Sequence, residues 1–186
     1  MNTIISDIIS FLPELFFGLL LTIRLWILSG IIGMTGGLLI GIVTCNRLRI
    51  PSVYIPLKIF VVIIRGIPLY IHVLIAYFVL PEWLGINLSA FSAAIIALSI
   101  ACTVYIAEIV RAGINSIAQG QWDACYVLGY TLRQTVWYVI IPQMLCNIFP
   151  ALINQFDSLI KSTAILSTIG VLEVTRIGMN IIARNM

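Results

Sequence analysis

Residues 120–142 read Gly-Gln-Trp-Asp-Ala-Cys-Tyr-Val-Leu-Gly-Tyr-Thr-Leu-Arg-Gln-Thr-Val-Trp-Tyr-Val-Ile-Ile-Pro, a polar stretch in a mostly apolar chain. The stretch predicts a short helix with Asp123 in its opening turn, where a carboxylate suits the positive end of the helix dipole. Gly129 can adopt a left-handed conformation and so end that helix. A second helix is expected to start near Thr131, and Pro142 predicts a bend just inside the apolar segment that follows.

The overall composition is that of a membrane protein. Of the 186 residues, 61% are hydrophobic and only 9% are charged, which is far from the average for soluble domains. We therefore predict an all-α polytopic membrane protein. The formal charge of +3 is too small and too scattered to indicate nucleic acid binding.

The chain lacks the motifs of an enzyme or a metal protein. Its cysteines lie in or beside apolar segments without a CxxC spacing, which argues against a disulfide framework and a zinc site; they are Cys45, Cys102, Cys125 and Cys146. No phosphate-binding GxxxxGK[ST] loop is present, so the chain is not expected to hydrolyse ATP itself. GxSxG and HExxH patterns are absent as well. We predict no catalytic residue, no metal and no cofactor.

Four apolar segments are long enough to cross a bilayer. They cover about 15–44, 53–80, 90–113 and 136–159. We expect residues 2–11 to form a short interfacial helix before the first segment. Residues 81–87 are expected to form an external, turn-rich loop, and 173–186 an amphipathic helical tail.

The first segment carries a small residue at every fourth position. These residues are Ser29, Gly33, Gly37 and Gly41. A ladder of this kind lets another helix approach closely, where packing rather than hydrophobic force drives association. We therefore expect a second helix to pack along this face.

The second segment is interrupted at 65–68, Arg-Gly-Ile-Pro. Pro68 cannot donate a hydrogen bond to the carbonyl four residues earlier, and its ring crowds that carbonyl. Arg65 places a charge at a depth where insertion costs about 2.5–3.5 kcal/mol. Arg65, Gly66 and Pro68 are therefore candidates for a substrate path in which the guanidinium would hold a carboxylate bidentately.

The same arginine also has a structural interpretation. Arg65 would then pair with an acidic residue of another segment, either Glu108 or Asp157. Two closer pairs are expected within single helices, Glu108 with Arg111 and Asp157 with Lys161, because residues three or four apart share a helix face.

The stretch from Gly120 to Pro142 resembles the cytoplasmic coupling loop of ABC-transporter permeases. The pattern in that family is Glu-Ala-Ala, three residues, Gly, nine residues, Ile, one residue, Leu-Pro. Here it reads Asp123-Ala124-Cys125, Gly129, Val139 and Ile141-Pro142.

The resemblance implies that loop 113–135 places a short helix in a groove of a cytoplasmic ATPase. The residues that it assigns to coupling are Gly120, Asp123, Ala124, Cys125, Gly129 and Pro142. Small side chains at Ala124 and Cys125 would permit close approach to the ATPase. An ordinary amphipathic loop helix is the alternative.

A wider resemblance, from about Gly18 to the last residue, is to permeases for polar amino acids. It is carried by Ile64-Arg-Gly-Ile-Pro-Leu, Tyr105-Ile-Ala-Glu-Ile-Val-Arg-Ala-Gly-Ile and Leu159-Ile-Lys-Ser-Thr-Ala-Ile. The chain departs from the subfamily at Ile67, where threonine is usual. It departs again at Ser162 and Ala164, where aspartate and serine are usual.

The resemblance implies a type I permease subunit of an ATP-driven importer of polar amino acids such as histidine, glutamate, glutamine or arginine. The implied partners are cytoplasmic ATPase subunits, a second permease subunit that is identical or different, and an extracytoplasmic amino-acid-binding protein. The implied location is the bacterial inner membrane. An ion-coupled carrier or channel fragment without an ATPase is the alternative class.

Members of this group have five spanning helices, whereas only four are predicted here. We therefore expect residues 1–186 to form a single permease domain that lacks the family's fifth helix through truncation at the C-terminus.

Basic residues predict the orientation in the membrane. They flank loops 45–52 and 113–135, and are Arg47, Arg49, Lys58, Arg111 and Arg133. Short loops rich in Lys and Arg remain in the cytoplasm. We therefore expect both loops inside and the N-terminus outside the cytoplasm.

Overall fold

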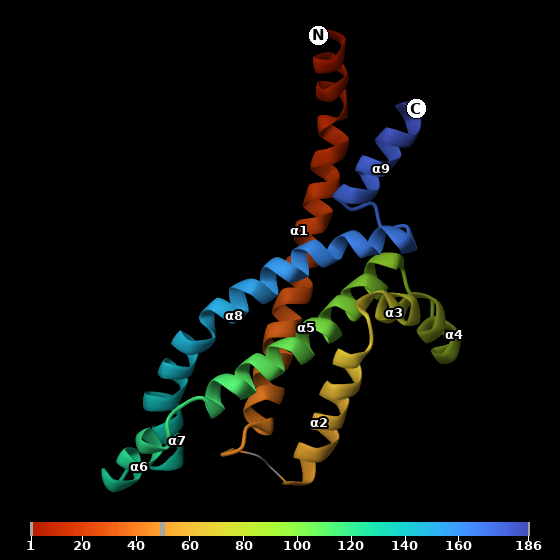
Figure 1. Cartoon of the computed structure of the whole chain (residues 1–186). Coiled ribbons are helices and arrows are strands. Elements are labelled where there is room, and N and C mark those ends of the chain that lie inside the picture. Colours follow the sequence, from red (N-terminus) through yellow and green to blue (C-terminus); the bar gives the residue numbers. More distant parts are fainter. Residues whose placement is uncertain (1, 49–50, 186) are drawn as a thin grey trace. The chain divides into compact units, whose positions relative to one another are not determined.

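The computed structural model describes residues 2–48 and 51–185 (Figure 1). Within these residues, all regular secondary structure is helical. The helices are α1 Asn2–Thr44, α2 Pro51–Gly66, α3 Leu69–Leu74, α4 Leu80–Leu84, α5 Ala90–Asn115, α6 Gln119–Val127, α7 Leu132–Gln134, α8 Ile141–Ser162 and α9 Val174–Asn185. Two π-helical turns, Ile75–Val79 and Thr135–Ile140, and a 3-10 helix, Thr163–Ile169, complete the order.

The described residues contain three helical stretches that are long and apolar enough to cross a membrane, Phe11–Thr44, Ala90–Asn115 and Leu132–Ile169. A fourth crossing results if Ser52–Gly66 and Leu69–Leu84 together form one broken span. The prediction of an all-α polytopic protein is therefore confirmed.

The expected interfacial helix at 2–11 is not a separate element. The backbone of α1 is helical from Asn2 to Thr44 and passes through Pro13. Proline sacrifices one backbone hydrogen bond, but its fixed φ is close to the helical value, so it need not end a helix.

Two prolines are each preceded by a π-helical turn. Ile75–Val79 lies just before Pro81, and Thr135–Ile140 lies just before Pro142. A π turn widens the helix by one residue and accompanies kinks at prolines. A π-helical turn therefore leads into α8 directly before Pro142, where the sequence predicted a bend.

The expected loop at 81–87 begins later than predicted. The helix α4 continues through Pro81 to Leu84, and Gly85 ends it with a φ of 64°. Because proline is tolerated in the first turn of a helix, Pro81 does not stop this one. Trp83 is 83% exposed.

The described residues form two compact units. One unit comprises the described parts of Met1–Ile31, Ile67–Ile100 and Asp157–Met186, and the other comprises Ile32–Gly66 and Ala101–Phe156. We call them the first and the second unit. The boundaries fall inside α1, α5 and α8 and between α2 and α3.

In the first unit, α9 packs along the N-terminal half of α1 (Figure 1). The backbone N–H of Val174 donates to the Thr22 hydroxyl at 3.2 Å. A side chain at Gly18 would collide with Val174, since an added Cβ would lie 3.0 Å from its Cα. Arg184 near the end of α9 forms an ion pair with Glu14. The predicted tail helix is present and lies against α1.

In the second unit, a seam of glycines brings α1 and α5 into close contact. Each glycine lies against one α5 side chain: Gly33 against Cys102, Gly37 against Ile106, and Gly41 against Val110. A Cβ at Gly37 would lie 2.6 Å from the Ile106 Cβ, a separation that atoms do not tolerate. Both helices contribute every fourth residue, so the seam follows one face of each helix. The fourth predicted ladder residue, Ser29, is buried in the first unit and donates to the Leu25 carbonyl at 2.5 Å.

Gly37→Ala should destabilise the protein, because the added methyl group meets Ile106 in a closed seam. We expect a loss of about 1–3 kcal/mol, the usual cost of overpacking, measured as a lower melting temperature of the purified protein in detergent. The matched control is Gly178→Ala in α9, where an added Cβ meets nothing within 4 Å. A Gly37→Ala protein that melts at or above the wild-type temperature would contradict the seam.

Candidate functional site

The loop between α5 and α8 is built around α6, a helix with a defined end. Gly129 has a φ of 75°, as predicted. The N–H of Tyr130 donates to the Cys125 carbonyl at 3.0 Å, and the N–H of Gly129 donates to the Tyr126 carbonyl at 3.0 Å. The bond between Tyr130 and Cys125 spans the end of the helix as in a Schellman cap, which requires a left-handed residue at the position of Gly129.

The next helical run begins at the residue expected from the sequence. Thr131 is the N-cap of α7 and forms a capping box with Gln134. The Thr131 hydroxyl accepts from the Gln134 N–H at 3.3 Å, and the Gln134 side-chain oxygen accepts from the Thr131 N–H at 2.8 Å. These reciprocal bonds satisfy N–H groups that a helix start leaves free.

Asp123 does not lie where the sequence predicted. The helix α6 begins at Gln119, so Asp123 is in its second turn rather than its first. Its carboxylate accepts a hydrogen bond from the Gln119 side-chain amide at 2.7 Å. Ala118 occupies the N-cap position without a side-chain cap, which explains why no sequence signal marked this start.

One face of α6 is held against the rest of the second unit. Trp122 is 8% exposed, and Cys125 is 4% exposed. The Arg47 guanidinium lies 5.6 Å from the centre of the Trp122 ring, within the range of a cation–π contact. Gln143 in α8 donates to the Gln121 side-chain oxygen at 3.0 Å. Cys125 therefore contacts the chain itself, and its small side chain does not offer close approach to a partner as expected.

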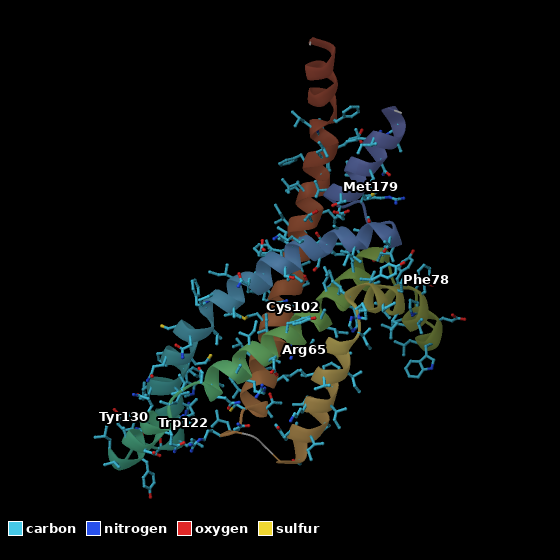
Figure 2. All side chains as sticks on the ribbon, viewed as in Figure 1. Arg65, Phe78, Cys102, Trp122, Tyr130 and Met179 are labelled. Atoms are coloured by element: carbon cyan, nitrogen blue, oxygen red, sulfur yellow. The ribbon has the colours of Figure 1, made fainter. Side chains whose placement is uncertain are left out.

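The C-terminal end of α6 carries exposed apolar side chains. Tyr126, Val127 and Leu128 are 84%, 83% and 72% exposed. Leu132, just beyond the turn, is exposed as well. We call these four residues the α6 patch. Figure 2 shows Trp122 and Tyr130 at this end of the second unit.

The other predicted coupling residues lie on α6 and at the start of α8. Gly120 and Ala124 are exposed on α6, and Pro142 lies at the start of α8. Arg47, Gln121 and Gln143 were not assigned to the loop from the sequence. Arg47 lies far from the loop along the chain, and neither glutamine belongs to a motif, so no local signal pointed to them.

A second cluster centres on Glu108 in α5. Arg111 binds both carboxylate oxygens, through Nε at 2.9 Å and through its terminal nitrogen at 2.6 Å. Arg65 at the end of α2 lies farther away, 3.8 Å from the same carboxylate, and its guanidinium is 5.5 Å from the centre of the Tyr105 ring. Figure 2 labels Arg65 in this cluster.

The structure also contains the predicted pair of Asp157 with Lys161 and the predicted interruption of the second segment. Lys161 donates to Asp157 at 2.6 Å, in the first unit. The helix α2 ends at Gly66, and α3 begins at Leu69, directly after Pro68.

An open groove of about 400 Å³ lies beside the arginine cluster in the second unit. Its polar lining comes from Arg65, Tyr105, Glu108, Ser116 and Asn147. Among the described residues, Arg65 has the long ion pair with Glu108 and the contact with the Tyr105 ring, and it forms no hydrogen bond. Its planar donors therefore remain available for a carboxylate. The described residues contain no group of three or more metal-ligating side chains.

A family model described as "Binding-protein-dependent transport system inner membrane component" matches residues 33–184. The chain belongs to this family. It is therefore a multi-pass inner membrane subunit of a binding-protein-dependent transport system, in which ATP hydrolysis belongs to a separate subunit. The predicted permease family is confirmed, and the alternative of an ion-coupled carrier loses its support.

Several similar proteins are named as amino-acid permeases. The chain is 35% identical over 176 residues to the arginine transport system permease protein ArtQ of Bacillus subtilis, covering 95% of this chain and 80% of that one. It is 36% identical to the putative glutamine transport system permease protein GlnP of Rickettsia conorii, covering 91% and 78%. It is 38% identical to the L-cystine transport system permease protein TcyB of Bacillus subtilis, covering 95% and 74%.

Solved structures share the fold. A crystal structure described as an amino acid ABC transporter with histidines matches with a TM-score of 0.83 at 36% identity, over 92% of this chain and 78% of that one. An inward-facing MetNI methionine ABC transporter matches with a TM-score of 0.77 at 24% identity, over 91% and 80%, and this likeness concerns the fold alone. The type I ABC permease fold predicted from the sequence is confirmed.

Gly129→Ala should loosen the end of α6. A Cβ at Gly129 meets nothing within 4 Å, so the change tests the backbone conformation alone. An L-residue in the left-handed region costs about 1–2 kcal/mol, so we expect roughly 5–30-fold faster hydrogen exchange of the Tyr130 amide.

Gly120→Ala is the matched control for this experiment. An added Cβ at Gly120 also meets nothing within 4 Å, but this glycine has no positive φ. Exchange at Tyr130 should therefore stay unchanged in Gly120→Ala. The same effect from both substitutions would show that the conformation at Gly129 is not what holds the turn.

Proposed function

We propose that this chain is the permease subunit of an ATP-driven importer of polar amino acids, with residues 1–186 acting as a single permease domain. The observation that carries the proposal is the α6 patch on a loop between two membrane-length helices. Membership of the binding-protein-dependent transport family and the relatives named for arginine, glutamine and cystine support the substrate class. The partners are cytoplasmic ATPase subunits, a second permease subunit and an extracytoplasmic amino-acid-binding protein.

In this proposal, α6 docks into an apolar groove of the ATPase. Tyr126, Val127 and Leu128 are exposed at the end of a short helix, and a short helix can bind a partner by placing exposed apolar side chains in a groove. Trp122 and Gln121, in the first half of α6, hold the helix to its own unit. A helix fixed in this way can transmit force between the ATPase and the spanning helices without detaching from the second unit.

Binding of α6 to a cytoplasmic ATPase requires one orientation of the chain in the membrane. Loops 45–52 and 113–135 lie in the cytoplasm, and the N-terminus lies outside. Arg47, whose guanidinium stacks on Trp122, supports this arrangement because it ties the end of α1 to the docking loop. A cytoplasmic ATPase reaches α6 only with the loop inside, so the docking experiment below also tests this orientation.

The groove beside Arg65 is the proposed contact for the substrate carboxylate. Arg111 occupies both oxygens of Glu108, so Glu108 neutralises Arg65 only partly, across 3.8 Å. A guanidinium at this distance from its acid can bind a second carboxylate bidentately. Asn147 adds an amide to the same groove.

Val127→Asp should prevent docking, because it places an unpaired charge in an apolar contact. We expect the affinity for the ATPase subunit to fall by roughly tenfold or more, measured by co-purification from membranes and by ATP-driven uptake in vesicles. The control is Asn87→Asp, which adds the same charge to an exposed residue near Gly85. Unchanged co-purification and uptake in Val127→Asp would overturn the coupling assignment.

Arg65→Gln should reduce amino-acid uptake more than Arg65→Lys, because lysine keeps the charge but loses the planar pair of donors. Arg65→Gln removes a hydrogen bond from a charged donor to the substrate carboxylate. We therefore expect uptake by this variant to fall by roughly tenfold or more. Membrane levels and ATPase co-purification of both variants serve as the check on assembly. If both assemble and transport at the wild-type rate, Arg65 is not part of the path.

A further inference from the structure

A second hollow, of about 170 Å³, lies between α2, the end of α1 and α5, and shares Arg65 and Glu108 with the groove. The residues of α2 that line it recur on one helix face and include Tyr54, Lys58 and Arg65. On α5 the polar lining is Glu108 and Arg111. Every one of these residues belongs to the second unit.

The lining carries more positive than negative charge. Lys58, Arg65 and Arg111 contribute three cations, and Glu108 is the one carboxylate among the described lining residues. Arg111 already occupies both oxygens of that carboxylate. Lys58 forms no ion pair within 4.0 Å among the described residues, and its ammonium group lies 5.5 Å from the centre of the Tyr54 ring. Two positive charges are therefore not neutralised in this hollow.

The depth of Lys58 matches a lipid headgroup. Lys58 is two turns into α2, about 10 Å from its start at 1.5 Å per residue. The outward face of α2 carries exposed aliphatic side chains at Ile55, Ile59 and Ile63. Val62, which is also exposed, lines the hollow itself. An apolar strip thus continues directly into a basic hollow, as a lipid with an acidic head and acyl chains requires.

We propose that this hollow binds the phosphate of an anionic phospholipid, such as phosphatidylglycerol, in the cytoplasmic leaflet. Basic pockets between spanning helices on the cytoplasmic side bind acidic headgroups, and uncompensated charges in a membrane segment need a partner. The assignment of the leaflet rests on the orientation given under the proposed function. Lys58 is the decisive residue, because it lines this hollow but not the groove proposed for the substrate.

The experiment is lipid binding by the purified permease in detergent, followed by native mass spectrometry. Phosphatidylglycerol, phosphatidylcholine with the same acyl chains, and inorganic phosphate are titrated separately. We expect phosphatidylglycerol to bind the wild type in preference to the other two. Lys58→Gln should weaken that binding about fivefold, the effect of one basic residue at a membrane surface.

Two further variants complete the design. Lys58→Arg should keep the binding, since the charge is retained. Arg133→Gln should also keep it, because Arg133 is a basic residue outside the hollow. Equal binding of phosphatidylcholine, or phosphatidylglycerol binding that Lys58→Gln leaves intact, would overturn the proposal. Inorganic phosphate binding as tightly as phosphatidylglycerol would overturn it in favour of a soluble anion.

This experiment needs neither an ATPase nor transport. It can therefore fail while Val127→Asp still prevents docking, or succeed while the docking assignment fails. The two proposals are tested independently.

Discussion

The close approach of α1 and α5 at the glycine seam is the contact on which the rest of the second unit depends. Gly33, Gly37 and Gly41 leave room for α5 side chains only because they have none of their own. The seam fixes the end of α1 beside the end of α5, where the Asn46 N–H donates to the Asn115 side-chain oxygen at 3.0 Å. From there, Arg47 reaches Trp122 on α6. The placement of α6 therefore depends on three glycines of α1 that have no side chain.

The second unit carries polar groups in two arrangements. Around α6, the Gln121 and Asp123 side chains each accept a hydrogen bond from an uncharged amide, of Gln143 and Gln119, and these bonds hold the loop. Around Glu108, by contrast, the basic side chains outnumber the one carboxylate. Satisfied hydrogen bonds specify a structure, whereas an excess of charge leaves capacity for an additional ligand. Both proposed ligands of the second cluster depend on this excess.

Local chemistry made part of this structure predictable. Gly129 and Thr131 were assigned correctly because a left-handed glycine and a capping threonine act within a few residues of themselves. The start of α6 was missed because Ala118 provides no cap. The burial of Trp122 and Cys125 was missed because it depends on residues remote in the sequence. Two expected boundaries, after residue 11 and before residue 81, were wrong, because the helices continue through Pro13 and Pro81.

The α6 patch has a consequence for how such a subunit is handled in the cell. On its proposed role, Tyr126, Val127 and Leu128 are covered only after an ATPase subunit arrives. Until then, each newly made copy displays a cluster of apolar side chains to the cytoplasm, the kind of surface that invites aggregation. Chaperones and proteases act on chains that expose such surfaces. The supply of the ATPase would then set how much permease survives, so that partner stoichiometry is enforced by degradation of the orphan subunit.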